Sequence, residues 1–384
     1  MADDHDRSQP YRLWPLDRRI LVGGSVIGAV VAAITLSFAY AGGLFSLGRL
    51  TQEDLIDTFQ DVNGVFSGFR RNHAKGVCVT GYFDSNGNGT NVSKAAVFEK
   101  GHIPVTGRFS LAGGKPYVAD SKTDIFALAV SFRPPDGEEW RTAMVDIPVF
   151  PVRDAAGFRD LLLASEADPA TGKPDPAKMK AFLAAHSEAP PALELITARA
   201  LSSGFDTASY NALNAFRFVN GDGTSTSVRW SMIAVDPAVA AVEPAAAPAG
   251  EPTAEPAAGS PVDKDKNFLF DALIARIERG PAQWHLVLTL GQSGDPTGDA
   301  SLPWPPDRER ADVGTLTFDH AETESPGNCR DINFDPLVLP SGIEPSDDPL
   351  LSARSAAYSI SYTRRAGEEK TPSEVQVPAT NKGS

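Results

Sequence analysis

Cysteine is scarce in this 384-residue chain, which has only two, Cys78 and Cys329. They form no Cys-x-x-Cys pair and belong to no Cys/His cluster, so the sequence gives no support for a zinc site. One disulfide and two free buried thiols remain equal alternatives, because separation along the chain does not establish proximity in space.

An excess of basic residues is also missing. Lys and Arg total 35 against 49 Asp and Glu, which gives a net charge of −14. No basic patch is present that could displace counterions from phosphates, so we expect no nucleic-acid partner. The hydrophobic share of 42% and the aromatic share of 8% are those of a folded protein with one large core or two small ones.

Charged residues are absent from the stretch 20–48. Its length predicts a transmembrane helix over 20–41, with 1–19 as a cytoplasmic tail, because Arg18 and Arg19 lie on the near side. A cleaved signal peptide ending near Ala39-Tyr40-Ala41 is the alternative, and a buried soluble helix is the weakest one. Both leading interpretations place the folded part outside the cytoplasm, in the periplasm of a bacterium, or secreted if the segment is cleaved. The cysteines then face an oxidising compartment.

The remaining pattern predicts an α+β fold. Thr51 to Asp54 has the residue types of a helix N-cap with early acids, and an apolar stripe follows it. Strands are predicted at 77–83, 95–98, 104–111, 124–132, 142–150, 227–235, 284–290 and 314–318. Helices are predicted at 155–165, 174–187, 209–217 and 267–279, and the Asn/Gly run at 85–90 is predicted as a hairpin loop. Residues 236–261 have an Ala/Pro linker composition, and 367–384 are predicted as a flexible tail.

Two short segments carry residues with possible chemistry. His73 precedes a predicted strand and could act as an acid–base catalyst, although most histidines only satisfy local hydrogen bonds. Tyr358 follows Arg354 by four residues, so on a helix the guanidinium could stabilise a phenolate that binds ferric iron. Neither signal is specific by itself.

The order of motifs supplies the specificity, because it resembles the catalase superfamily and, within it, the small membrane-anchored catalase-related heme peroxidases. The similarity covers about 60–366, apart from the Ala/Pro insert, so 50–366 is predicted as the catalase-like heme domain. The matching motifs are 70–76 with 81–83, 108–110, 148–154 with Phe158, 269–271, 280–284, 304–305, 313–314, 334–336, 340–346, and Arg354-x-x-x-Tyr358.

This resemblance implies a catalase-core antiparallel β-barrel with surrounding helices and a bound heme b. Tyr358 would be the axial iron ligand, kept anionic by Arg354. His73 would be the catalytic acid–base group, oriented by Ser110. The remaining cofactor-binding residues would be Arg70, Arg108 and Arg365, which would pair with the heme propionates or lie around the proximal tyrosine, and Phe158 beside the heme.

One departure from the family concerns the two asparagines that catalases carry before the Pro-x-Phe segment. Here they are Val145 and Asp146, with Val145 in the place that faces the peroxide. Valine neither donates nor accepts a hydrogen bond, and if the register slips by one, an ionised Asp146 only accepts. The resemblance therefore implies a peroxidase that uses a small-molecule electron donor and has at most weak catalase activity. The alternatives are a hydroperoxide-rearranging relative and a non-catalytic heme-binding or peroxide-sensing module.

Overall fold

A computed structural model describes residues 18–41, 50–168, 170–236 and 266–378. The chain divides into two compact units, Met1–Leu50 and Thr51–Ser384. The first contains helix α1 (Arg18–Ala41). Within the described part of the chain, no helix combines the length and apolar character needed to cross a membrane. The transmembrane helix predicted over 20–41 is therefore not found among the described residues.

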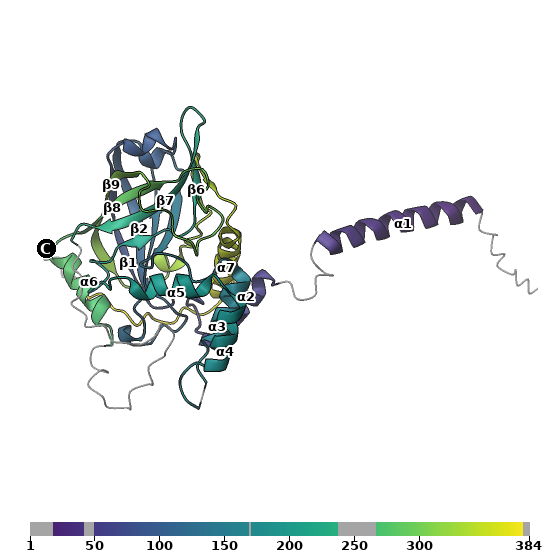
Figure 1. The fold of residues 1–384 in the computed structure, drawn as a ribbon, viewed down its shortest axis with the longest axis horizontal. Helices are drawn as coiled ribbons and strands as arrows, with labels where there is room; N and C mark the ends of the chain where they lie inside the picture. The colour runs from purple at the N-terminus through teal and green to yellow at the C-terminus, as the bar shows by residue number, and fades with distance from the viewer. Residues whose placement is uncertain (1–17, 42–49, 169, 237–265, 379–384) are drawn as a thin grey trace, which may run out of the picture. The chain divides into compact units, whose positions relative to one another are not determined.

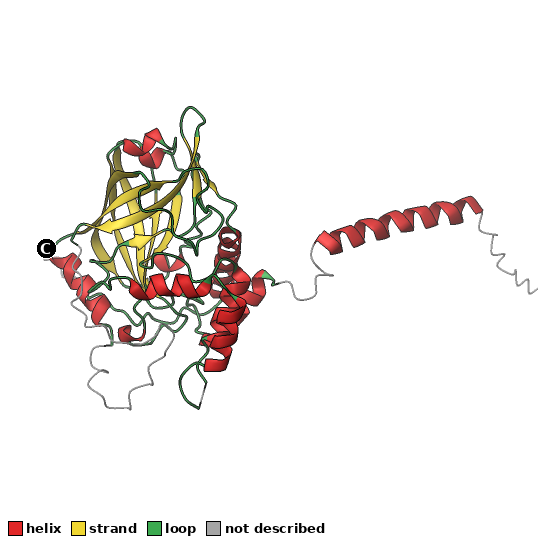
Figure 2. Cartoon of the chain, in the orientation of Figure 1, coloured by secondary structure: helices red, strands yellow, loops and turns green. Residues whose placement is uncertain are grey.

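The second unit is built around a closed antiparallel β-barrel (Figure 2). Strands follow one another around the ring in the order β7-β5-β4-β3-β2-β1-β9-β8, and pairing of β8 with β7 closes it. The strands of the ring are β1 (Gly76–Ser85), β2 (Gly101–Leu111), β3 (Phe126–Phe132), β4 (Trp140–Val145), β5 (Tyr210–Asn211), β7 (Ser225–Ala234), β8 (Ala282–Leu290) and β9 (Arg310–Glu322). The strands β6 (Phe216–Val219) and β10 (Ile343–Pro345) extend the sheet beyond β7.

The barrel interior is filled with large apolar side chains. Phe109 on β2 is at the centre of the ring contacts, with Trp284 at 5.5 Å and Phe318 at 5.6 Å between ring centroids. Alternate residues point inward where only one face of a strand is covered, as the burial pattern of β8 shows, whereas β2 and β3 have runs of buried residues. The interior is thus a packed core, and any ligand site must lie outside it.

Helices cover the barrel on the outside (Figure 1). Contacts join α2 to both α7 and α3, and α3 to α4, while α6 contacts β9. The helices of this unit are α2 (Gln52–Asn63), α3 (Ala155–Ala164), α4 (Pro176–Ala185), α5 (Ala189–Ala198), α6 (Phe268–Arg279) and α7 (Pro349–Ala366), with short 3₁₀ turns η1 (Asn88–Asn91), η2 (Ala96–Phe98), η3 (Asp120–Lys122) and η5 (Cys329–Asp331).

The α+β class and the antiparallel barrel are confirmed, and two predicted elements are wrong. The strand predicted at 95–98 is replaced by η2 at 96–98, in which Phe98 packs on Phe218 instead of pairing with a strand. The predicted helix at 209–217 forms β5 and β6, because Tyr210 pairs with Met232 and Phe216 with Val228. The Asn/Gly run at 85–90 does lie in the loop of the hairpin formed by β1 and β2, which closes with Ser85 opposite Gly101, and this long loop contains η1 and η2.

The segment predicted to be a flexible C-terminal tail packs on the barrel in its described part. Val375 is 1% exposed and belongs to the core. Two residues later, the Val377 backbone donates a hydrogen bond to the Thr323 hydroxyl at 2.8 Å. The prediction failed because a polar composition conceals this single apolar anchor. The Ala/Pro-rich linker and most of the N-terminal tail lie outside the described residues.

Candidate functional site: a cavity between the barrel and helix α7

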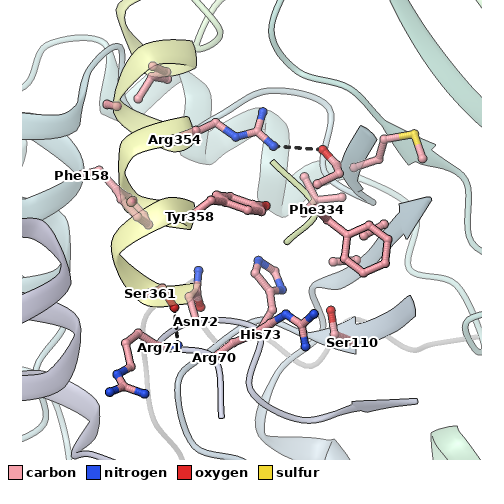
Figure 3. A pocket seen from close by; sticks show the side chains of 18 of the residues that line it. Arg70, Arg71, Asn72, His73, Ser110, Phe158, Phe334, Arg354, Tyr358 and Ser361 are labelled. Atoms are coloured by element: carbon pink, nitrogen blue, oxygen red, sulfur yellow. Dashed lines mark hydrogen bonds between the residues drawn. The ribbon is translucent and has the colours of Figure 1, made fainter. Parts of the chain in front are cut away.

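A cavity of about 210 Å³ lies between the barrel strands β2, β3 and β4 and the helices α2, α3 and α7. Most of its wall is apolar, and its polar groups are a histidine, a tyrosine, two serines, asparagines and arginines. Figure 3 shows His73 and Tyr358 projecting into the same space from opposite sides. The residues that sequence motifs single out and that line this cavity are Arg70, His73, Arg108, Ser110, Val145, Phe158, Arg354, Tyr358 and Arg365.

His73 lies three residues before β1 in a backbone conformation that few side chains adopt. Its φ of +53° is the only positive value at a non-glycine residue in the part of the chain described. The buried Nδ1 atom has no hydrogen-bond partner. Burial, with the charges of Arg108 and Arg354, lowers the pKa of His73 to about 4. The imidazole is therefore neutral near pH 7 and free to accept a proton.

Ser110 lies near the end of β2, buried and in the wall of the same cavity. The sequence predicts that its hydroxyl orients the imidazole of His73. The structure brings the two residues together, as Figure 3 shows, but without the expected hydrogen bond to Nδ1. The backbone of His73 is instead held by Arg108, whose Nη1 donates to the His73 carbonyl at 2.8 Å.

Tyr358 and Arg354 lie one turn apart on α7, as the four-residue spacing predicts. The helix begins at Pro349. Asp348 is its N-cap, and the Asp348 carboxylate accepts a hydrogen bond from the Leu350 backbone at 2.9 Å. The Arg354 guanidinium donates to Asn214 and to the Ala143 carbonyl, the latter at 3.0 Å. It is therefore fixed on the barrel side of the cavity.

Arginines gather around one buried carboxylate at another part of the wall. Arg108 donates to Glu324 through Nε at 2.6 Å and through Nη2 at 3.2 Å. Arg70 donates to the same carboxylate at 3.2 Å. Arg365 is 2% exposed and donates to the backbone carbonyls of Arg330 and Ile332. Two guanidiniums thus share one carboxylate, and the charge of Arg108 also repels that of Arg365, so positive charge is in excess at this part of the wall.

The pKa values of these groups report the same imbalance. Burial and the neighbouring charge of Arg108 lower the pKa of Arg365 to about 10. Burial, together with Arg108 and Arg365, also lowers the pKa of Arg70. Burial alone would raise the pKa of Glu324, but Arg108 and Arg70 outweigh it and hold that pKa below its usual value. An anion placed here would relieve the repulsion among the guanidiniums.

Val145 takes the cavity-facing place at the end of β4, and the register does not slip. Asp146, the next residue, points elsewhere: its carboxylate accepts a hydrogen bond from the Phe126 backbone at 2.9 Å and lies 3.9 Å from Arg199. Burial raises the pKa of Asp146 to about 6, with Arg199 opposing the shift. The wall therefore offers no amide or carboxylate at this position.

Several wall residues were not predicted from the sequence. Asn214 joins Asp348, at 2.8 Å, to Arg354 and so ties α7 to the barrel. Asn211 donates to the Ile147 carbonyl at 3.0 Å. Helix α2 supplies Phe59, whose ring packs edge-on against Phe158 at 5.7 Å. Apart from the apolar stripe of α2, no local signal in the sequence distinguishes these residues.

Cys78 and Cys329 form a disulfide, with 5.6 Å between their Cα atoms. It joins β1 to η5, and both residues are fully buried. Together with Glu324 the two sulfurs are close enough to ligate a metal ion, but they are bonded to each other. The disulfide excludes thiolate ligation, because a metal binds the deprotonated sulfur.

The fold defines the class of protein. Solved structures with this arrangement include a fungal catalase, with a TM-score of 0.65 and 19% identity, and catalase A from Saccharomyces cerevisiae, with a TM-score of 0.66 and 20% identity. Each comparison covers 83% of this chain, and the chain covers 64% and 65% of those proteins. The barrel is therefore that of a catalase core.

The sequence comparisons place the chain more closely. The family model described as Catalase matches residues 50–382. A catalase-related peroxidase of Synechococcus elongatus is 34% identical over 88% of this chain and 96% of its own length. A second catalase-related peroxidase, from Mycolicibacterium paratuberculosis, is 30% identical over 84% of this chain and 97% of its own length. The chain belongs to the catalase family.

Proteins of this family bind heme, and the residues present here fit such a group. Nδ1 of His73 is buried and has no hydrogen-bond partner in the protein, as is common for a polar atom in a ligand site. The excess guanidinium charge suits carboxylates of the kind that heme carries at its edge. Tyr358 offers a phenol oxygen as an iron ligand, and the apolar wall suits a macrocycle.

Proposed function

We propose that this chain is a heme-dependent peroxidase that reduces hydrogen peroxide or organic hydroperoxides with electrons from a small organic donor. The observation that carries the proposal is that His73 and Tyr358 face one cavity from opposite sides (Figure 3). The names of the two catalase-related relatives support an oxidoreductase that acts on peroxide.

The roles of the residues follow from their chemistry. Heme b, when bound through Tyr358, would supply the iron at which the peroxide O–O bond is reduced. Arg354, one helical turn before Tyr358 on α7, would supply a positive charge that favours the phenolate form of Tyr358. Arg70, Arg108 and Arg365 would bind the carboxylates of the group. Phe158, packed on Phe59, would contribute to the apolar wall.

His73 would move the proton. Because its pKa is about 4, the neutral imidazole can take the proton of a bound hydroperoxide and return it to the leaving oxygen. The overall reaction converts ROOH, two electrons and two protons into ROH and water. The organic donor supplies the electrons and the protons, so the reaction balances without a second peroxide molecule.

Val145 supports peroxidase over catalase activity. A catalase cycle must oxidise a second peroxide, which benefits from a hydrogen-bonding side chain beside it. The valine side chain contributes nothing of that kind, and Asp146 lies outside the cavity wall. An organic donor has no need of this hydrogen bond, so its oxidation is unaffected.

The first test is the absorption spectrum of the full chain purified from heme-sufficient cells. We expect a ferric tyrosinate-type heme spectrum that Tyr358→Phe alters, and donor oxidation that His73→Ala slows by roughly 10²–10⁴-fold. A colourless protein would overturn the proposal.

The second test measures the ratio of oxygen release to donor oxidation. Val145→Asn should raise this ratio at least several-fold, because the asparagine amide both donates and accepts hydrogen bonds beside the peroxide. Asp146→Asn is the matched control: it introduces the same amide one residue later and should leave the ratio unchanged. An unchanged ratio in the Val145→Asn variant would contradict the assignment.

The folded unit is proposed to work outside the cytoplasm, and the Cys78–Cys329 disulfide supports this, since such bonds persist in oxidising compartments. Thiol-specific labelling of acid-quenched cells tests it. We expect labelling of both cysteines only after reduction, and two reactive thiols before reduction would contradict the proposal.

A further inference from the structure

Of the three cavity-wall arginines near Glu324, two are oriented by the backbone of one short segment, 329–332. Arg70 Nη2 donates to the carbonyls of Cys329 at 3.1 Å and Ile332 at 3.0 Å. Arg365 donates to the carbonyl of Arg330 and, at 3.3 Å, to that of Ile332. The direction in which both guanidiniums point therefore depends on the path of this segment.

The segment is fixed to the barrel by the Cys78–Cys329 disulfide. Cys78 lies on β1, which is paired with β2 on one side and β9 on the other, so its position is fixed by the sheet. Asn328 also anchors the turn, since its side chain donates to the Thr323 carbonyl at 2.8 Å. If the bond is reduced or removed, no covalent link holds the turn against β1, and two separated thiols need more room in a site where both are fully buried, so we expect the turn to shift.

Arg108 provides an internal contrast. It is held by Glu324 and by the carbonyls of His73 and Ala74, none of which belongs to the segment. Movement of residues 329–332 would thus release Arg70 from two of its backbone acceptors and Arg365 from both of those described, while leaving the contacts of Arg108 in place. The effect should fall on part of the anion-binding wall.

We propose that the disulfide is a positioning element for Arg70 and Arg365, so that tight retention of a cofactor with two carboxylates requires the oxidised bridge. This inference rests on the proposed function. The disulfide would thus couple binding of the cofactor to the oxidising environment in which the disulfide forms. The reduced chain would bind hemin with lower affinity than the oxidised chain.

The test compares two ligands on the full chain prepared without cofactor. Hemin and hemin dimethyl ester share the macrocycle and the iron, but the ester lacks the two negative charges. Each is titrated by absorbance into the oxidised protein and into the Cys78→Ala/Cys329→Ala variant. Hemin affinity should fall at least ten-fold in the variant, while ester affinity should change less than two-fold.

The outcomes separate the two proposals. Equal hemin affinity in both proteins, or an equal loss for hemin and the ester, overturns the positioning role. Failure of the oxidised chain to bind hemin at all overturns the proposed function instead. If the double variant does not fold, Arg365→Gln in oxidised protein is used: it should weaken hemin and spare the ester, and equal weakening of both ligands counts against the proposal.

Discussion

At the scale of single residues, His73 combines a backbone strain with an unsatisfied side chain. A left-handed conformation costs about 1–2 kcal/mol at a residue with a Cβ, and an unpartnered buried nitrogen adds to that. Such a combination persists when the surrounding structure imposes it, and it is found most often at sites of function. Stability and activity should therefore oppose each other at this position.

His73→Gly tests that opposition. Glycine adopts the left-handed conformation without strain, so the free energy of unfolding should stay the same or rise by about 1 kcal/mol. Donor oxidation should be lost because no imidazole remains. His73→Ala removes the same imidazole but keeps a Cβ, and should be about 1 kcal/mol less stable than the glycine variant. Chemical denaturation measures the free energy of unfolding of both variants, and equal values would contradict the proposed backbone strain at residue 73.

Asp146 predicts a pH dependence of stability. Its pKa of about 6 in the folded state lies above the ordinary 3.8, so between these values the folded state binds more protons than the unfolded state. Stability should then fall as pH rises from about 4 to about 6 and stay lower above that range, by up to ~3 kcal/mol. Asp146→Asn keeps an acceptor for the Phe126 N–H and should be more stable at pH 7.5, with little difference at pH 4. A difference independent of pH would refute this account.

At the scale of elements, β1 holds Arg108 in place because Gly76 has no side chain. A Cβ on Gly76 would lie 2.4 Å from Nη2 of Arg108. Gly76→Ala should therefore displace the guanidinium, lower stability by about 1–3 kcal/mol and weaken hemin binding. Gly101→Ala on β2 is the control, since its Cβ would meet nothing closer than 4.0 Å. Thermal unfolding and hemin titration of both variants check the prediction, and equal behaviour would exclude it.

Elements that are specified by residues within their own segment were predictable from the sequence. The helix after Thr51 is an example, because its capping box with Asp54 forms as the residues suggest. The segment 209–217 was not predictable, since Tyr210 and Phe216 become strand residues only by pairing with β7. Helix α5 was missed because it begins with two prolines, Pro190 and Pro191, near its first turn.

The candidate site shows the same division. The motif residues of the family were found and do line one cavity. Asn214 was not, because its link between Asp348 and Arg354 exists only in three dimensions. The missing hydrogen bond between Ser110 and His73 could not be predicted either, since it depends on the orientation of a ring.

At the scale of the whole molecule, the C-terminal segment stabilises the chain that leads to His73. Glu368 pairs with the buried Arg71 and accepts a hydrogen bond from the Gly68 backbone at 2.8 Å. Glu368→Gln leaves the Arg71 charge without its counterion and should lower stability by about 1–3 kcal/mol. Glu369→Gln, in the exposed residue next to it, should have no effect. Thermal unfolding of both variants measures this, and an unchanged Glu368→Gln variant would show that the segment is dispensable.

The disulfide has a consequence for the order of events during synthesis. Its two cysteines are separated by 251 positions, and each accompanies one side of the cavity: Cys78 follows His73, and Cys329 precedes Tyr358. The first half of the site therefore leaves the ribosome long before the second half exists. Nascent chains stalled before Tyr358 should bind no hemin, so the cofactor is captured only after Tyr358 has been synthesised.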